Sequence, residues 1–273
     1  MMRALHPILT AGAALGLSLA LCPAAHAQRG AVDKFSDTEI APRAREAAET
    51  ARVRPLIEAE KLRPRIAGTW QAPRITAIMA ANGKLPPMTA ASRRLYNRRI
   101  AERKAGKGDD PLNVCLPAGT PRILFMGGPV IITQAPIKVT FFHQFQHIIR
   151  HVFLDAPLKA ADLDPSWQGE SAGHWDGDTL TIETTGFNGK LWLDQAGLPQ
   201  SPQMIVRERL RLIDADTLED VITIDDKGAY AAPWSTTVRF KRLPDDTIIE
   251  DDNCLETHLE FPLKEYAPTP PGR

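Results

Sequence analysis

The segment from Ser171 to Phe187 constrains the fold of this chain more than any other stretch. Asp176-Gly177 is a dipeptide that tolerates the positive φ angles of a two-residue hairpin turn. After it, apolar side chains recur at every second position, as Leu180 and Ile182 show. The segment therefore predicts a β-hairpin and, with it, a β-rich fold.

The two arms of this hairpin predict which side chains share a face. With Asp176-Gly177 as the turn, Trp175 is expected opposite Asp178, and His174 opposite Thr179. One face is expected to carry Trp175, Leu180 and Ile182, and the other His174, Thr181 and Glu183. The hairpin indicates architecture, and no reaction follows from it alone.

From Cys115 onward, short strands separated by turns recur about every ten residues, a pattern typical of a sandwich or barrel. The connections are mostly too short for helical crossovers, so the sheet is expected to be antiparallel and largely meandering. The expected strands are Val130–Thr133, Ile137–Gln144, Ile148–Leu154, Ser171–Trp175, Asp178–Thr185, Met204–Ile213, Leu218–Ile224, Ser235–Leu243 and Thr247–Cys254.

Gly68-Thr-Trp70 resembles the G-x-W that opens the first strand of lipocalin-like barrels. Together with the strands that follow, it favours a mainly β fold: an antiparallel, meandering, calycin-like (lipocalin-like) barrel with N-terminal helical segments. A barrel of this size holds one small ligand.

Two stretches before the barrel are predicted to be helical: Asp37–Leu62 and Thr89–Ala105. The second carries the basic residues Arg93, Arg94, Arg98, Arg99, Arg103 and Lys104. These form either a patch for an acidic partner or a solvated helix face. The expected organisation is a signal peptide at residues 1–27, a helical and extended segment at 28–110 that includes the G-x-W strand, and the barrel at 111–273.

The N-terminus has the features of a cleaved secretory signal. Arg3 is followed by the apolar run 8–21 and by the A-x-A site Ala25-His-Ala27. The run is too short to span a bilayer stably. Cys22 would suit a lipoprotein, but Leu21 stands where a small residue is expected. We therefore expect a soluble periplasmic protein without a stable membrane anchor.

Charge and cysteine content narrow the partners and the compartment. The chain has 33 Lys and Arg against 33 Asp and Glu, so losing Arg3 leaves it nearly neutral and without a general attraction for nucleic acid. Cys115 and Cys254 remain after cleavage. In an oxidising compartment an even pair is expected to form a disulfide. A zinc site is not expected from two cysteines.

The block Trp167-Gln-Gly-Glu-Ser-Ala-Gly-His-Trp-Asp-Gly-Asp-Thr-Leu180 is similar to the core of a large, mostly uncharacterised family of secreted bacterial proteins, W-x-G-x-S-x-G-x-W-x-G-D-T-L. Further similar stretches are Cys115–Arg122, Gly186–Asn188, Trp192–Asp194, Val206–Arg209 and Tyr230–Trp234. The resemblance implies secretion and a β-rich fold. Relatives often carry Pro-His-Ser where this chain has Pro199-Gln-Ser201, and an acidic residue near His143.

Three histidines, His143, His147 and His151, lie close together in the sequence. A hairpin turning near Phe145 would make His143 and His151 cross-strand neighbours on one face. They could form an exposed polar ladder, serve as general acids and bases, or hold zinc. No His-Glu-x-x-His or similar spacing supports the metal, so none is expected. His174 is a further catalytic candidate.

Glu208 interrupts an otherwise apolar strand face, and Asp220 does the same on the next strand. With the turn centred on Ala215, Glu208 falls opposite Ile222 and diagonal to Asp220. A carboxylate inside an apolar interior costs several kcal/mol unless it is paired, and its pKa tends to rise. Glu208 is therefore either a site residue or the partner of an inward arginine.

Tyr230, Trp234 and Trp192 are expected at the barrel mouth, where they would bind an apolar or aromatic ligand together with His147 or simply plug the barrel end. The chain has no Gly-rich phosphate loop, no dinucleotide fingerprint and no G-x-S-x-G elbow.

Three functions are consistent with these features. The first is a cofactor-free periplasmic lyase or isomerase that uses His and carboxylate groups on a small apolar or aromatic compound, such as a lignin-derived one. The second is a non-catalytic carrier or sensor of a hydrophobic ligand. The third is an envelope protein that docks a partner through its basic helix.

Overall fold

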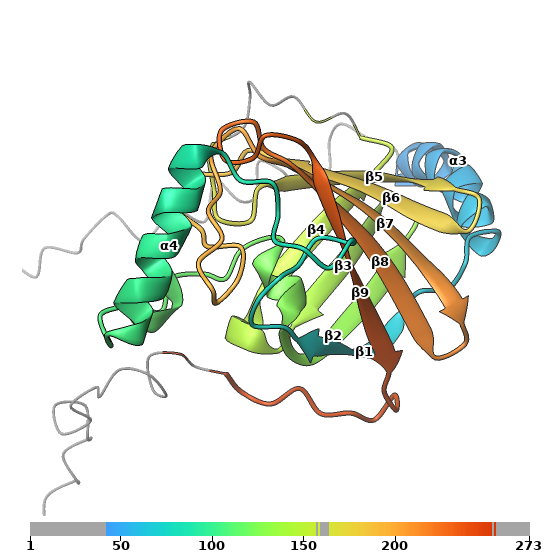
Figure 1. Ribbon diagram of the computed structural model, residues 1–273. Coiled ribbons are helices and arrows are strands. Elements are labelled where there is room, and N and C mark those ends of the chain that lie inside the picture. The colour runs from blue at the N-terminus through green and yellow to red at the C-terminus, as the bar shows by residue number, and fades with distance from the viewer. Residues whose placement is uncertain (1–41, 157, 159–163, 253, 255–273) are drawn as a thin grey trace, which may run out of the picture. The chain divides into compact units, whose positions relative to one another are not determined.

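The computed structural model describes residues 42–156, 158, 164–252 and 254. Nine strands follow one another around a closed barrel, and each pairs with its neighbours in sequence (Figure 1). The strands are β1 Gly68–Arg74, β2 Met126–Ala135, β3 Lys138–His143, β4 Ile149–Leu154, β5 Glu170–Asp176, β6 Thr179–Thr185, β7 Ile205–Asp214, β8 Thr217–Asp225 and β9 Trp234–Arg242. The predicted mainly β barrel is confirmed.

One strand pair departs from the expected antiparallel meander. β4 and β5 run parallel, with Val152 beside Ser171 and Leu154 beside Gly173. Parallel neighbours need a connection of about a dozen residues or more, and residues 155–169 supply one. The barrel is therefore mixed, and the prediction of a purely antiparallel sheet was wrong at this pair.

The β5–β6 hairpin forms with a register two residues away from the predicted one. Asp176 pairs with Thr179, and Trp175 with Leu180, so the turn is Gly177-Asp178. Of these two, only Gly177 has a positive φ, of 60°, which is the pattern of a type II′ turn. A shift by two residues leaves every side chain on its predicted face, because side chains alternate with period two.

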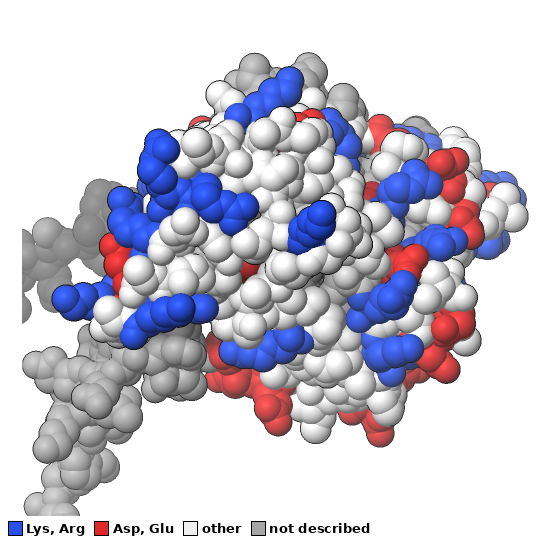
Figure 2. Space-filling model, in the orientation of Figure 1, with Lys and Arg blue, Asp and Glu red and all other residues white. Residues whose placement is uncertain are grey.

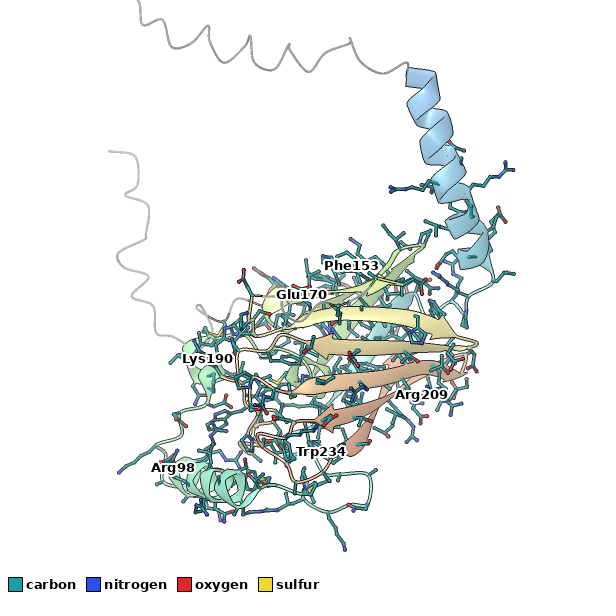
Figure 3. The ribbon with its side chains drawn as sticks, turned by 90° about the horizontal axis from the view of Figure 1, so that it is seen from above. Arg98, Phe153, Glu170, Lys190, Arg209 and Trp234 are labelled. Atoms are coloured by element: carbon teal, nitrogen blue, oxygen red, sulfur yellow. A yellow bond between two sulfur atoms is a disulfide. The ribbon has the colours of Figure 1, made fainter. Side chains whose placement is uncertain are left out.

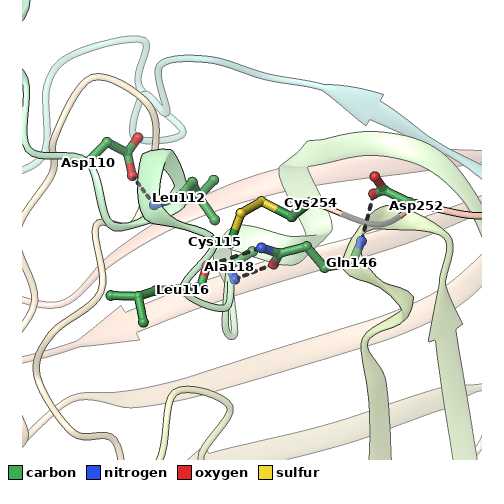
Figure 4. Close-up of a disulfide and its surroundings, with 8 residues drawn as sticks. All are labelled: Asp110, Leu112, Cys115, Leu116, Ala118, Gln146, Asp252 and Cys254. Carbon is green, nitrogen blue, oxygen red and sulfur yellow. Dashed lines mark hydrogen bonds between the residues drawn. A yellow bond between two sulfur atoms is a disulfide. The ribbon is translucent and has the colours of Figure 1, made fainter. Parts of the chain in front are cut away.

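The predicted last strand, Thr247–Cys254, was wrong. β1 and β9 pair through Trp70 with Arg242 and close the barrel, so no free edge remains for another strand. Residues 247–252 form neither helix nor strand and contact the β3–β4 turn instead. There, the backbone N–H of Gln146 donates to Asp252 at 2.7 Å (Figure 4).

The predicted disulfide between Cys115 and Cys254 is confirmed. Their Cα atoms lie 5.6 Å apart and their positions are 139 residues apart in the chain. Gln146 holds the same loop, because its side-chain amide contacts the backbone N–H of Ala118 and the carbonyl of Leu116 (Figure 4). The bridge therefore fastens the C-terminal segment to the loop that precedes the barrel's second strand.

Both predicted helical stretches contain a helix. α3 spans Pro42–Lys61 and includes Pro55; α4 spans Ala90–Lys104. Thr89 caps α4 by accepting a hydrogen bond from the backbone N–H of Ser92 at 3.2 Å. The chain divides within α3 into two compact units, Met1–Arg52 and Val53–Arg273.

The predicted leader, residues 1–27, lies outside the described residues. Among the residues that are described, no helix is both long and apolar enough to cross a bilayer.

The basic helix α4 is attached to the rest of the second unit by two of its arginines. Arg99 lies over the Trp192 ring, 4.6 Å from its centroid, and donates to the Gly197 carbonyl at 3.1 Å. Arg103 donates to the Gln195 carbonyl at 2.6 Å. Other basic residues of α4, such as Arg98, are exposed, and Figure 2 shows Lys and Arg gathered over this helix. One part of the basic surface of α4 therefore packs on the loop at residues 192–197, and the rest is exposed to solvent.

Asp194 joins two segments that lie at the same end of the barrel as α4. Its carboxylate accepts the backbone N–H of Ile78 at 2.8 Å and those of Gly197 and Leu198 at 2.8 and 2.9 Å. The pKa of Asp194 is raised, because the effect of burial exceeds the lowering effect of these hydrogen bonds. Through this one side chain, the segment after β1 is fixed to the loop that packs on α4.

The barrel interior is built by alternation, since every second residue of each strand points inward. Large apolar side chains such as Trp70, Leu180 and Ile222 are fully buried there. Outward positions are exposed, and Figure 3 shows Phe153 and Arg209 on the outer side. The inward face also carries several polar residues, and these define the candidate site.

Candidate functional site

An ion pair between β4 and β7 lies at the centre of the polar residues inside the barrel. The guanidinium of Arg150 donates to Glu208 Oε1 at 2.9 Å and forms a second, shorter bond to Oε2. Both side chains are 2% exposed. This bidentate geometry is the strongest form of the Arg–carboxylate contact. Glu208 is therefore the partner of an inward arginine, one of the two roles its position predicted.

Two hydroxyl groups also accept hydrogen bonds from Arg150. Its Nε donates to Ser171 Oγ at 3.0 Å, and its Nη2 donates to Thr184 Oγ1 at 2.8 Å. The two hydroxyls lie 2.9 Å apart, on β5 and β6. A buried charge is tolerated when its hydrogen bonds are satisfied, and Arg150 meets this condition. The cluster of Arg150, Ser171, Thr184 and Glu208 therefore links strands β4 to β7.

Asp220 lies next to this cluster on β8. Burial raises its pKa well above the ordinary value, and the charge of Glu208 and a hydrogen bond with it raise the pKa further. Two carboxyl groups can share a hydrogen bond only when one is protonated, so this contact favours the protonated form of Asp220. Burial disfavours the charge on Arg150, but Glu208 and Asp220 outweigh burial and raise the Arg150 pKa.

His143, at the end of β3, is another titratable group of the barrel interior. It is 3% exposed, and burial together with the nearby charge of Arg150 lowers its pKa to about 3. The imidazole is therefore neutral at physiological pH. Its Nε2 is buried and has no hydrogen-bond partner among the described residues.

Polar atoms of three further buried side chains also lack a partner among the described residues. They are Oδ1 of Asp220, both amide atoms of Gln200 and Nε1 of Trp234. Gln200 follows Pro199, whose carbonyl accepts from the Tyr230 hydroxyl at 2.8 Å, and Tyr230 packs edge-on against Trp234 with ring centroids 5.4 Å apart. Most buried polar atoms in proteins are paired, so this group requires an explanation. We call His143, Gln200, Asp220 and Trp234 the unpaired set.

The structure brings some of the predicted catalytic residues together and separates others. Glu208 pairs with Ile222 across β7 and β8 with Asp220 close by, as predicted. His151 is on the outer face of β4, where its Nδ1 lies 3.1 Å from Thr140 Oγ1. His174 is exposed on the outer face of β5, opposite Thr181.

The prediction that His143 and His151 share a face was wrong. Phe141 pairs with Arg150, and Thr140 pairs with His151. Arg150 therefore points into the barrel beside Phe141, and His151 points outward beside Thr140. The β3–β4 turn sets this register, with left-handed backbone at Gln146 and His147, whose φ angles are 53° and 49°. A turn one residue longer or shorter would have turned His151 inward.

His147 lies on the surface with the C-terminal segment. Its Nε2 is 3.1 Å from the Glu250 carbonyl oxygen and 3.2 Å from the Asp252 backbone nitrogen, and its ring stacks on Phe142. Of the three clustered histidines, His143 is therefore inside the barrel, His151 is on its outer face, and His147 contacts the C-terminal segment. Within the described ranges, no group of three or more His, Cys, Asp or Glu is placed to hold a metal ion.

The predicted aromatic residues do gather at the end of the barrel near α4, where Figure 3 labels Trp234. Tyr230 and Trp234 pack on each other, and both are buried. Trp192 is 2% exposed and packs under Arg99 of α4. All three close this end of the barrel.

Sequence reasoning missed Arg150, Ser171 and Gln200. Arg150 alternates with Val152 and Leu154, but Ile149 and Phe153 form an equally apolar face, so the sequence alone did not indicate the inward side. Ser171 was visible as the Ser of the W-x-G-x-S motif. Gln200 was visible as a departure from the Pro-His-Ser that relatives often carry.

Comparison with known proteins identifies no family for this chain. The chain matches no family model and no curated protein sequence. One similar solved structure is the crystal structure of a mutant of the fluorescent protein UnaG, at 12% sequence identity and a TM-score of 0.29, covering 65% of this chain and 95% of that one. The resemblance to the family of secreted bacterial proteins stays a prediction.

Proposed function

We propose that this protein is a periplasmic carrier or sensor that binds one small aromatic molecule with hydrogen-bonding groups inside its barrel. The unpaired set supports this proposal. Its atoms comprise an imidazole nitrogen, an amide, a carboxyl oxygen and an indole N–H, all buried among apolar side chains. Ligand sites in barrels have this composition: apolar walls with a few polar groups that fix orientation.

The neighbouring cluster favours binding over catalysis by Glu208. Both oxygens of this carboxylate are bound to Arg150, which leaves Glu208 poorly placed as a general base. The unpaired set, by contrast, is free to exchange hydrogen bonds with a ligand. The disulfide supports an oxidising compartment such as the periplasm, because such bonds are rare in the cytosol.

Ligand binding to the unpaired set requires movement, because its unpaired atoms are sealed from solvent. Gln200 belongs to the segment between β6 and β7, which covers this end of the barrel, so that segment is the one we expect to move. Association should then be slower than about 10⁵ M⁻¹s⁻¹, since binding that needs a conformational change lowers the on-rate.

Titration with 2-methoxyphenol, followed by NMR of the mature protein, tests the proposal. We expect saturable shifts for the indole N–H of Trp234 and a loss of affinity of about tenfold in His143→Phe or Gln200→Leu, as expected for one lost hydrogen bond to a buried ligand. His151→Gln is the matched control, because His151 lies on the outer face of the same hairpin. Binding unchanged in both interior variants would contradict the proposal.

A second candidate is the cofactor-free lyase or isomerase, and one observation favours it. His143 is neutral at neutral pH and the pKa of Asp220 is raised by burial and by Glu208, so the interior holds an unprotonated imidazole and a carboxyl group that favours its protonated form. Groups whose pKa values are displaced in this way serve as base and acid in enzymes. If the bound aromatic is converted to product, Asp220→Asn should abolish turnover while binding persists. Recovery of the ligand unchanged after prolonged incubation would contradict the enzyme and leave the carrier or sensor as the proposed function.

A further inference from the structure

A cavity lies outside the barrel, at the same end as α4. Its volume is about 380 Å³, and its walls come from β1, α4, the segment that precedes the disulfide, and the loop that holds Trp192. No member of the unpaired set lines it. It is therefore a site distinct from the one proposed above.

Three arginines face this cavity from different elements. Arg74, at the end of β1, is exposed and has no hydrogen bond or ion pair from its side chain among the described residues. Arg103 of α4 uses one Nη1 bond on the Gln195 carbonyl. Arg122 is 1% exposed, and its Nε is buried without a described partner.

The acidic residues of the cavity are already engaged. Both oxygens of Asp110 accept from Arg122, at 2.7 and 2.6 Å. Asp252 accepts the backbone N–H of Gln146 at 2.7 Å. With Arg74, Arg103 and Arg122 facing Asp110 and Asp252, the lining carries an excess of one positive charge. An anion entering the cavity would therefore meet available donors and a favourable potential.

Part of the remaining wall of the cavity is apolar and aromatic. Trp192, Phe145, Leu112 and Met126 contribute to it. A flat apolar ring can pack on such side chains, whereas a fully hydrated anion such as phosphate gains nothing from them. The arginines of the lining therefore suit an anionic group, and its apolar side chains suit a ring of the same molecule.

We infer that this cavity binds a small aromatic carboxylate, with the ring against Phe145 and Leu112 and the carboxylate at Arg74 and Arg103. Arginine holds a carboxylate through parallel N–H bonds, which favours it over a neutral amide of the same shape. Arg122 anchors the wall through Asp110 and keeps the cavity positive.

The test is calorimetric titration of the mature, oxidised protein with benzoate, and with benzamide and inorganic phosphate as comparison probes. We expect saturable binding of benzoate and weaker binding, by about tenfold or more, of both benzamide and phosphate, which corresponds to one charged hydrogen-bonded contact. Arg74→Gln should weaken benzoate by a similar factor. Arg94→Gln is the control, because Arg94 is an exposed arginine of α4 that does not line the cavity.

Each outcome decides the inference. Equal affinity for benzoate and benzamide, or no saturable benzoate binding, would overturn it. Phosphate binding as tight as benzoate would show a plain anion site and also reject the aromatic ligand. His143→Phe separates this site from the barrel interior: it should weaken 2-methoxyphenol binding by about tenfold and leave benzoate binding unchanged.

Discussion

Arg150 and Glu208, which lie 58 residues apart in the sequence, form a bidentate ion pair inside the barrel with both side chains 2% exposed. The pair spans β4 and β7, and hydroxyls of Ser171 and Thr184 accept two further hydrogen bonds from Arg150. Removing one partner would leave the other as a buried, unpaired charge.

We therefore expect Arg150→Met to lower the free energy of unfolding by about 3 to 5 kcal/mol, the cost of an uncompensated buried charge. The double variant Arg150→Met, Glu208→Leu should recover most of that loss. Urea unfolding monitored by tryptophan fluorescence measures both. Arg207→Met is the control: its pair with Glu183 is about half exposed, so the loss should stay below about 1 kcal/mol. Similar losses for both arginines would contradict the role assigned to Arg150.

The buried His143 should make stability depend on acidity. Its pKa falls from 6.5 to about 3 on folding, so the unfolded chain binds more protons between these two values. The stability that His143 contributes is complete above pH 6.5 and falls as the pH drops towards 3, by up to on the order of 5 kcal/mol. His143→Gln should flatten the pH dependence of unfolding in this window, and His151→Gln should leave it unchanged. An equally steep curve for His143→Gln would contradict the assignment.

Asp220 should give the opposite dependence of stability on pH. Its pKa is raised on folding, so its contribution to stability is present below the unfolded value near 3.8 and is lost as the pH rises through the folded value. Asp220→Asn keeps a hydrogen-bond donor beside Glu208 but cannot ionise. We expect this variant to gain stability relative to the wild type as the pH rises above about 4, measured by urea unfolding. A difference that does not change with pH would show that Asp220 ionises in the folded protein as it does in the unfolded chain.

The Cys115–Cys254 bridge closes a loop across most of the barrel. We expect the double variant Cys115→Ala, Cys254→Ala to lose about 2 to 4 kcal/mol of unfolding free energy, because the bridge restricts the unfolded chain. A reducing agent should lower the melting temperature of the wild type and leave that of the double variant unchanged. Equal effects of the reducing agent on both proteins would contradict a stabilising bridge.

Arg99 should hold α4 in place. Losing its contact with the Trp192 ring and its bond to Gly197 should cost about 1 to 2 kcal/mol locally, so Arg99→Ala should speed amide hydrogen exchange in α4. Arg98→Ala is the control on the same helix, because Arg98 is 67% exposed and faces away from the barrel (Figure 3). Identical exchange in the two variants would show that Arg99 does not attach the helix.

The sequence alone determined the β-rich class, most strand positions, the disulfide and the inward direction of Glu208. These features depend on local alternation and on turns such as the one near Ala215, where the register to Ile222 follows from the loop length. They can be read from neighbours in the chain.

Only the tertiary structure decided what Glu208 contacts. The β4 strand has two apolar faces, and the side on which Arg150 falls depends on the left-handed turn at Gln146 and His147. Closure of the barrel by β1 and β9 likewise left Thr247–Cys254 without a strand to pair with. The burial that lowers the His143 pKa and raises that of Asp220 comes from elements far apart in sequence, so no local pattern could predict it.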